Sequence, residues 1–154
     1  MGKGFTQPHL NLYKMRKIKN ILLVLTMTIV IPTMAYSQTE KEVEKWERVM
    51  NAIIAVESEG NTKAQSKDCV GVLQIRPILV HDVNEYLKIK KSNKRFTLND
   101  RFSVSKSKEM FVLCQERYNP TNNVEKAIRL WNGGCGYSLS KTEKYYRKVL
   151  AHMK

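Results

Sequence analysis

The chain has 154 residues, which allows at most one domain and excludes a multidomain architecture. Its 27 Lys and Arg residues outnumber its 14 Asp and Glu residues, and the formal net charge is +13. A basic chain of this kind suits a polyanionic partner, such as a bacterial cell wall, a membrane surface or a nucleic acid. No motif that reads a nucleic-acid groove is present in the sequence, so we expect no nucleic-acid partner.

The N-terminal residues predict an export signal. A short basic segment, 15–20, precedes an unbroken apolar and Thr run at 21–31, and small residues follow at Ala35 and Ser37. This order is typical of a secretory signal, with cleavage after Ser37 and a periplasmic or extracellular destination. The alternative is a retained membrane anchor, although the apolar run is shorter than the about 20 residues that a spanning helix needs.

Residues 1–37 are therefore assigned to a leader. The translation start is Met1 or, as the alternative, Met15. The remaining 117 residues, 38–154, keep a net charge of +8, because the leader holds five basic residues and no acid. This length is enough for one compact core. We expect any membrane contact to come from the signal segment alone.

An all-α fold is predicted for the chain after the leader, without a convincing strand. The apolar spacing predicts helices at about 40–58, 77–90, 104–118, 123–131 and 142–150. Pro77 can occupy the first position of the second helix, and Thr142 can cap the last one. A polar loop is expected at 60–71, a basic polar stretch at 91–103 and a turn at 119–122.

Glu57 is the most informative residue of the first predicted helix. An apolar stripe recurs every three or four residues along this helix: Val43, Trp46, Met50 and Ile53. Glu57 takes the next position on the stripe, and Gly60 is expected to end the helix soon after it. Apolar surroundings and the helix C-terminus both oppose a negative charge, so we expect a raised pKa and a role as general acid. The alternative is an ordinary surface glutamate.

Three cysteines remain after the leader: Cys69, Cys114 and Cys135. Cys114 lies in a helical pattern and is expected in the core. No CxxC or Cys/His spacing is present, so we expect no zinc site, no other metal and no cofactor. An oxidising compartment permits one disulfide and one free thiol, and a bridge between Cys69 and Cys135 is a candidate.

Four short motifs follow one another along the helical chain. They are Glu57-Ser58, Ala-x-Ser leading into Gly-Val-Leu-Gln-Ile at 64–75, Trp-Asn-Gly-Gly at 131–134, and Thr-x-x-Tyr at 142–145. Their order and spacing resemble the soluble lytic transglycosylase domain of the lysozyme-like superfamily, which is also similar to goose-type lysozyme. The resemblance covers about residues 42–151. The chain departs from the family pattern at Gly133, where Ala is usual, and at Val72-Leu73, where Leu-Met is usual.

The resemblance implies an enzyme that cleaves peptidoglycan with one acid and base. Glu57 would protonate the oxygen between N-acetylmuramic acid and N-acetylglucosamine. It would then take the proton of the muramoyl 6-hydroxyl as that oxygen closes on C1 and leaves a 1,6-anhydro end. The alternatives are a muramidase, which uses water and could use Asp68, a wall-binding or assembly protein without turnover, and a cationic membrane-active or nucleic-acid-binding protein.

The resemblance also implies substrate-binding residues around the catalytic carboxyl: Ser58, Ser66, Gly71, Gln74, Asn132 and Tyr145. The Gln74 amide would bind sugar acetamido groups, and Gly71 would let the backbone approach the sugar. The Tyr145 hydroxyl would hold the carboxyl in place, with Tyr146 as the alternative one residue further along the chain. A place in a larger assembly that spans the cell envelope follows from family analogy alone.

Overall fold

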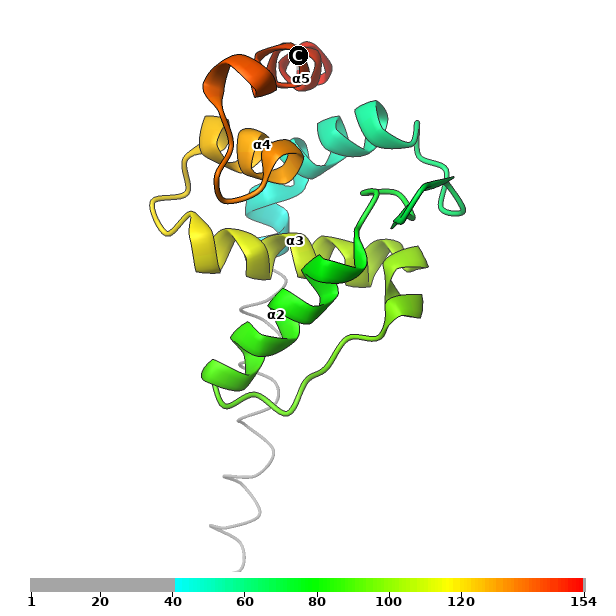
Figure 1. Ribbon diagram of the computed structural model, residues 1–154, viewed down its shortest axis with the longest axis vertical. Helices are drawn as coiled ribbons and strands as arrows, with labels where there is room; N and C mark the ends of the chain where they lie inside the picture. The colour runs from blue at the N-terminus through cyan, green and yellow to red at the C-terminus, as the bar shows by residue number, and fades with distance from the viewer. Residues whose placement is uncertain (1–40, 154) are drawn as a thin grey trace, which may run out of the picture. The chain divides into compact units, whose positions relative to one another are not determined.

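The computed structural model describes residues 41–153, which belong to one compact unit. Most of these residues are helical (Figure 1). The helices are an opening helix at 41–57, α2 (Pro77–Ile89), α3 (Val104–Tyr118), α4 (Val124–Gly133) and α5 (Leu139–His152). The expected all-helical class is confirmed at this level, while the predicted leader lies outside the described residues. Between residues 41 and 153, no helix has both the length and the apolar character needed to cross a membrane.

Local sequence explains where three of the helices begin. Pro77 opens α2 at a position where its missing N–H costs no hydrogen bond. The Ser103 side chain accepts a hydrogen bond from the backbone N–H of Lys106 at the start of α3. Asn123 does the same for Lys126 at the start of α4, with a distance of 2.8 Å. The boundaries predicted from apolar spacing and from Pro77 agree with the structure to within two residues for α2, α3 and α4, although the caps Ser103 and Asn123 were not predicted.

The last helix begins earlier than the sequence predicts. Its N-cap is Ser138, and Thr142 lies buried inside the first turn. The Thr142 hydroxyl donates to the Ser138 carbonyl at 2.8 Å and accepts from the Arg129 guanidinium at 3.0 Å. Thr142 is therefore not the cap, because the helix has already begun at Leu139, and the Thr142 hydroxyl instead connects the first turn to Arg129 of α4.

A small antiparallel ribbon lies within the predicted polar loop. Strand β1 (Gln65–Ser66) pairs with β2 (Cys69–Val70), and an isolated bridge joins Val70 to Ile75. The expectation of no strand was therefore wrong. Strands of two residues are too short to produce a recognisable alternation of apolar and polar side chains. The basic stretch that follows α2 contains a further element, the 3-10 helix η1 (Leu98–Phe102).

The hydrophobic core forms around the opening helix. Trp46, Met50 and Ile53 of the predicted apolar stripe are all buried. The Phe111 ring of α3 lies between two tryptophans, with centroid distances of 6.0 Å to Trp46 and 4.9 Å to Trp131. These aromatic contacts join the opening helix, α3 and α4. They hold the opening helix against α3 and α4 through Trp46.

One residue of the face predicted for α4 is not buried. Ala127 and Ile128 are fully buried and Trp131 is half-buried, as the spacing predicts, but Val124 is 40% exposed. Val124 is the first residue of α4. A periodic pattern predicts burial least well at the ends of a helix, because the chain is only entering the helix there.

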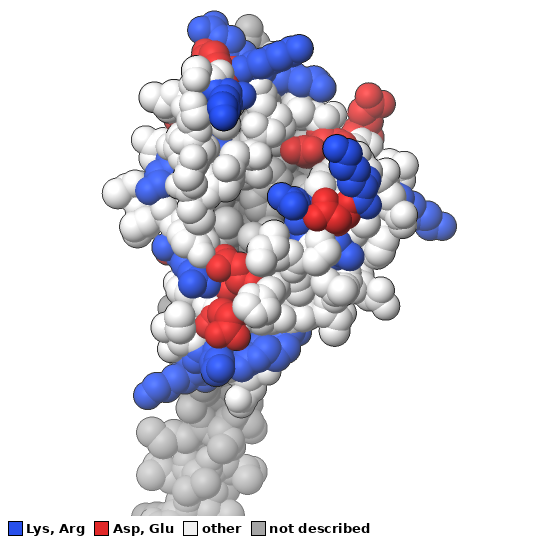
Figure 2. All heavy atoms as spheres, viewed as in Figure 1, with Lys and Arg blue, Asp and Glu red and all other residues white. Residues whose placement is uncertain are grey.

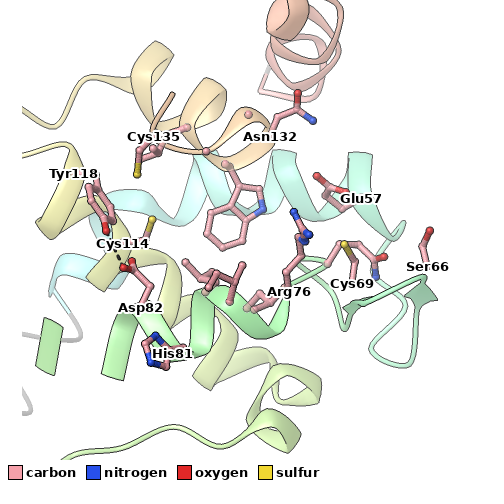
Figure 3. A pocket seen from close by; sticks show the side chains of 18 residues that line it. Glu57, Ser66, Cys69, Arg76, His81, Asp82, Cys114, Tyr118, Asn132 and Cys135 are labelled. Carbon is pink, nitrogen blue, oxygen red and sulfur yellow. Dashed lines mark hydrogen bonds between the residues drawn. The ribbon is translucent and has the colours of Figure 1, made fainter. Parts of the chain in front are cut away.

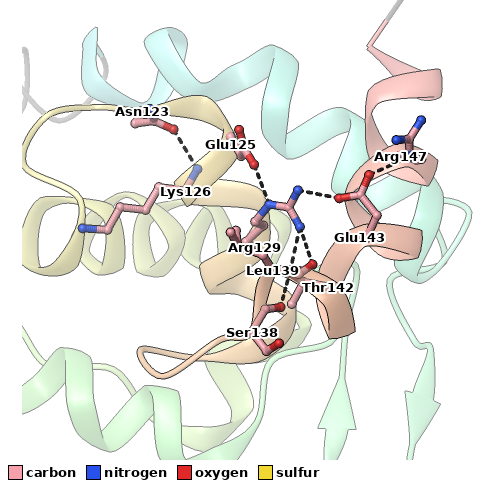
Figure 4. A network of polar contacts seen from close by, with 9 residues as sticks. All are labelled: Asn123, Glu125, Lys126, Arg129, Ser138, Leu139, Thr142, Glu143 and Arg147. Carbon is pink, nitrogen blue, oxygen red and sulfur yellow. Dashed lines mark hydrogen bonds and ion pairs between the residues drawn. The ribbon is translucent and has the colours of Figure 1, made fainter.

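Arg129 joins α4 to α5, which lie in contact (Figure 4). This side chain is only 4% exposed. Its guanidinium contacts two carboxylates, one carbonyl and one hydroxyl: Glu125 at 2.8 Å, Glu143 at 2.7 Å, Leu139 at 2.9 Å and Thr142 at 3.0 Å. It also lies 4.3 Å from the centre of the Tyr146 ring. The network sets the position of α5, the helix that carries both candidate tyrosines.

Candidate functional site

A cleft of about 680 Å³ opens beside the end of the opening helix. Its walls come from that helix, from the ribbon and the segment after it, from α2 and α3, and from the segment that ends α4 (Figure 3). In space-filling view this face of the molecule is hollowed, with acidic and basic side chains around the hollow (Figure 2). Segments far apart in the sequence therefore meet around one space of a size typical of ligand sites.

Glu57 is the last residue of the opening helix and lies half-buried in the cleft wall. Burial raises the pKa of its carboxyl above the ordinary value of 4.5, while the Tyr145 hydrogen bond and the charge of Lys148 lower it in part. The upward direction expected from the sequence is confirmed, and burial is the main cause. None of the ion pairs formed by residues 41–153 includes Glu57. The carboxyl therefore holds a proton to a higher pH than an exposed glutamate does.

Tyr145, and not Tyr146, is the tyrosine that contacts Glu57. Its hydroxyl donates a hydrogen bond to Oε1 of the carboxyl at 2.7 Å. Burial and the charge of Glu57 both raise the pKa of Tyr145, so its hydroxyl stays a donor. The Tyr146 ring instead lies against Arg129. The contact is the one that the sequence resemblance implies, and its catalytic importance remains a prediction.

Gln74, Asn132 and Ser66 also line the cleft. Gln74 has a positive φ of 50°, which is uncommon for a residue with a side chain. Its amide nitrogen donates to the carbonyls of Gly71 at 2.9 Å and Ala64 at 3.2 Å. These bonds leave the amide oxygen as an acceptor for a ligand N–H. Asn132 and Ser66 are exposed on the wall and offer further polar groups.

Two residues expected at the substrate do not line the cleft. The Ser58 hydroxyl donates to the carbonyls of Val72 at 2.8 Å and Ile54 at 3.2 Å, which closes the end of the opening helix. Gly71 is buried, and a Cβ at this position would lie 1.9 Å from the Arg101 carbonyl oxygen. The close approach that Gly71 permits is therefore that of the Arg101 backbone. The predicted approach of a sugar to Gly71 has no support in the geometry.

The other carboxylates near the cleft are engaged in ion pairs. Asp68 pairs with Arg76 at 3.0 Å on the exposed surface and does not line the cleft. The hydrogen bond from Arg76 also lowers the pKa of Asp68. Asp82 does line the cleft, but it binds Arg117 at 2.9 Å and the Tyr118 hydroxyl at 2.8 Å. Among the described residues, Glu57 is thus the one carboxylate in the cleft wall that has no ion-pair partner.

The predicted bridge between Cys69 and Cys135 is absent, and all three cysteines are free thiols. Both residues line the cleft, but Figure 3 shows them toward opposite ends of it. Cys69 lies close enough to Glu57 to sense its charge, whereas Cys135 contributes to the raised pKa of Tyr118. Cys69 lies just before Gly71 and Cys135 lies between Gly134 and Gly136, but a place beside a glycine in the sequence says nothing about the distance between the two cysteines in the fold. Cys114 is buried, as predicted.

Other residues of the cleft gave no functional signal in the sequence. The Trp131 indole N–H donates to the Leu73 carbonyl at 3.1 Å, which ties α4 to the opposite wall. Ile78 is 65% exposed, and His81, which has no predicted role, lines the cleft beside it. Ile78 stands out only because a large apolar side chain is exposed there. Exposure is a property of the folded chain, so the sequence could not reveal it.

The site thus brings together Glu57, Gln74, Asn132 and Tyr145 from four separate segments. No group of three His, Cys, Asp or Glu side chains within residues 41–153 could hold a metal ion. Comparisons of the chain with protein-family models, with curated proteins and with solved structures gave no match.

Proposed function

We propose that the protein is a lytic transglycosylase of lysozyme-like fold, which cleaves the glycan strands of peptidoglycan. The observation that carries the proposal is the state of Glu57. This carboxyl is half-buried in the cleft wall, has a raised pKa, takes part in no ion pair of the described residues and is held by the Tyr145 hydroxyl. A carboxyl in this state can act as a general acid near neutral pH. The motifs of the sequence and the polar groups of Gln74 and Asn132 in the same cleft support the proposal.

The proposed reaction uses one carboxyl twice. Protonated Glu57 gives its proton to the oxygen that leaves C1 of the muramoyl residue. The carboxylate then takes the proton of the muramoyl 6-hydroxyl while that oxygen bonds to C1, and a 1,6-anhydro end results. The internal hydroxyl is part of the same sugar, so its approach costs little entropy. A hydrolase usually needs a second carboxylate to activate water or to bond to C1, and the nearby Asp82 and Asp68 are both engaged.

The charge of the chain and its predicted export signal agree with this substrate. Peptidoglycan is polyanionic, and a chain with a net charge of +8 after its leader attracts such a polymer. The proposed site of action is the periplasm or the outside of the cell, where the wall is found.

Analysis of the reaction products tests the proposal. The purified full chain is incubated with peptidoglycan, and the released muropeptides are analysed by mass spectrometry. We expect products with 1,6-anhydromuramoyl ends. Products with reducing ends would show a muramidase instead, and binding to the wall without release of muropeptides would show a wall-binding protein.

The Tyr145→Phe variant is expected to lower the rate by roughly 10- to 100-fold, because the acid loses the group that orients it. In the wild type, activity should fall as the pH rises through the raised pKa of Glu57, since the acid must start protonated. The Tyr145 hydrogen bond lowers that pKa, so its removal should move the alkaline limb of the pH–rate profile to higher pH.

The matched control for this experiment is Tyr146→Phe. It keeps the aromatic ring beside Arg129 and leaves the hydrogen bond to Glu57 untouched. Its pH–rate profile should therefore coincide with that of the wild type. An alkaline limb that moves to lower pH in Tyr145→Phe, or does not move, would show that this hydroxyl does not set the protonation of the acid.

A further inference from the structure

The end of the cleft away from Glu57 holds two thiols that the proposed reaction does not use. Cys114 of α3 is 6% exposed, and Cys135 is exposed in the segment that follows α4. Both line the cleft, and Figure 3 shows them on the side where Asp82 and Tyr118 lie. A pair of free thiols that share one pocket is a candidate for disulfide formation.

Cys135 lies toward the face of α3 that carries Cys114 and Tyr118, and the pKa directions of these two groups agree with this position. Burial raises the pKa of Cys114 to about 12, and Asp82 and Cys135 add to the rise. Burial and Asp82 also raise the pKa of Tyr118 to about 12, and Cys135 again contributes. Cys114 and Tyr118 are four residues apart, so they share one face of the helix. The third thiol, Cys69, is influenced by Asp68 and Glu57 at the other end of the cleft.

The segment that carries Cys135 has room to move. Cys135 stands between Gly134 and Gly136, and a Cβ built on either glycine would meet no atom within 4 Å. A disulfide needs a Cα separation of about 5.5–6 Å and a defined dihedral angle. Glycines in open space allow the backbone to adjust toward that geometry, whereas α3 on the other side is fixed by the core.

We propose that a disulfide oxidant links Cys114 to Cys135, which joins α3 covalently to the segment after α4 and closes this end of the cleft. The exposed Cys135 thiolate attacks the oxidant, forms a mixed disulfide and releases the first thiolate. Cys114 then loses its proton and attacks the Cys135 sulfur, and the second thiolate leaves. The two cysteines together lose two electrons and two protons, and the oxidant is reduced to two thiols.

The order of these steps follows from the exposure of the two sulfurs. Cys135 is exposed and accessible to a bulky oxidant, whereas Cys114 is buried in the wall of the cleft. With a pKa of about 12, Cys114 is rarely a thiolate at neutral pH. The second step is therefore the slow one and accelerates at higher pH. The inference concerns these thiols alone and is independent of whether Glu57 is catalytic.

Peptide mapping tests this inference. The full chain is incubated with oxidised glutathione at mildly alkaline pH, the remaining thiols are alkylated, and the protein is digested with trypsin without reduction. We expect the peptides 109–117 and 130–141 to be joined by a disulfide. The number of free thiols should fall from three to one, with Cys69 as the remaining thiol. Oxidation should also raise the melting temperature by roughly 5 °C or more, and reduction should reverse the rise.

Serine variants make the result specific. Cys69→Ser keeps the proposed pair and should retain no free thiol after oxidation, whereas Cys135→Ser should retain Cys114 as a free thiol. A linked peptide that contains Cys69 would overturn the inference. The inference would also be overturned if prolonged oxidation left glutathione attached to Cys135 and left Cys114 as a free thiol, which the alkylation step would detect.

Discussion

The Glu57→Gln variant is expected to lose peptidoglycan cleavage by at least about 1000-fold, because the glutamine amide has no acidic proton to give to the leaving oxygen. Its side chain keeps the size of glutamate and can still accept the hydrogen bond from Tyr145. The loss should therefore appear in the rate of muropeptide release while binding to the wall is kept. Equal clearance of labelled peptidoglycan by the wild type and the variant would refute the catalytic role.

The stability of the same variant shows whether its loss of activity comes from chemistry or from misfolding. The pKa of Glu57 is raised in the folded protein, so the folded state favours the protonated carboxyl. The stability that protonated Glu57 contributes is fully present below the pKa that this carboxyl has in the unfolded chain. It is lost as the pH rises through the higher pKa of the folded protein. At neutral pH the glutamine variant should consequently be at least as stable as the wild type in thermal unfolding. Glu59→Gln, two residues away and exposed, is the matched control and should keep full activity.

The Gly71→Ala variant is expected to reduce the free energy of unfolding by about 3–5 kcal/mol, since it combines a strained backbone with a collision. Gly71 has a φ of +76°, and the added methyl group would lie 1.9 Å from the Arg101 carbonyl oxygen. That oxygen accepts a hydrogen bond from Ser107, and the Arg101 guanidinium donates to the carbonyls of Asp68 and Ile75. The backbone of Gly71 is held as well, because its N–H donates to the Ala64 carbonyl and its carbonyl accepts from the Gln74 N–H. Neither side of the collision can therefore move without breaking hydrogen bonds.

Two other glycines separate the causes of this effect. Gly134 has a φ of +70° and a ψ of −173°, a conformation that residues with a side chain rarely adopt, but open space at its Cβ position, so Gly134→Ala should cost about 1–3 kcal/mol from backbone strain alone. Gly136 also faces open space and lacks the positive φ, so Gly136→Ala should change stability by less than about 0.5 kcal/mol. Urea unfolding of the three variants measures the difference. Equal losses for Gly71→Ala and Gly134→Ala would show that the contact with Arg101 is not the cause.

The sequence alone determined the features of this protein that depend on neighbouring residues. The spacing of Trp46, Met50 and Ile53 correctly placed one face of the opening helix in the core. Glu57, the next position on this face, is half-buried and lines the cleft. The boundaries of α2, α3 and α4 followed from the apolar spacing and, for α2, from Pro77. These features are predictable because a helix repeats every 3.6 residues and its ends need local hydrogen-bond partners.

The tertiary structure alone decided which side chains meet. Spacing could not distinguish Tyr145 from Tyr146, since the choice depends on how Arg129 orients α5 against α4. It could not reveal that Gly71 faces its own backbone or that Cys69 and Cys135 lie toward opposite ends of the cleft. A repeat along one helix defines a face but carries no information about the distance to another segment. Such distances are set by the packing of the whole core.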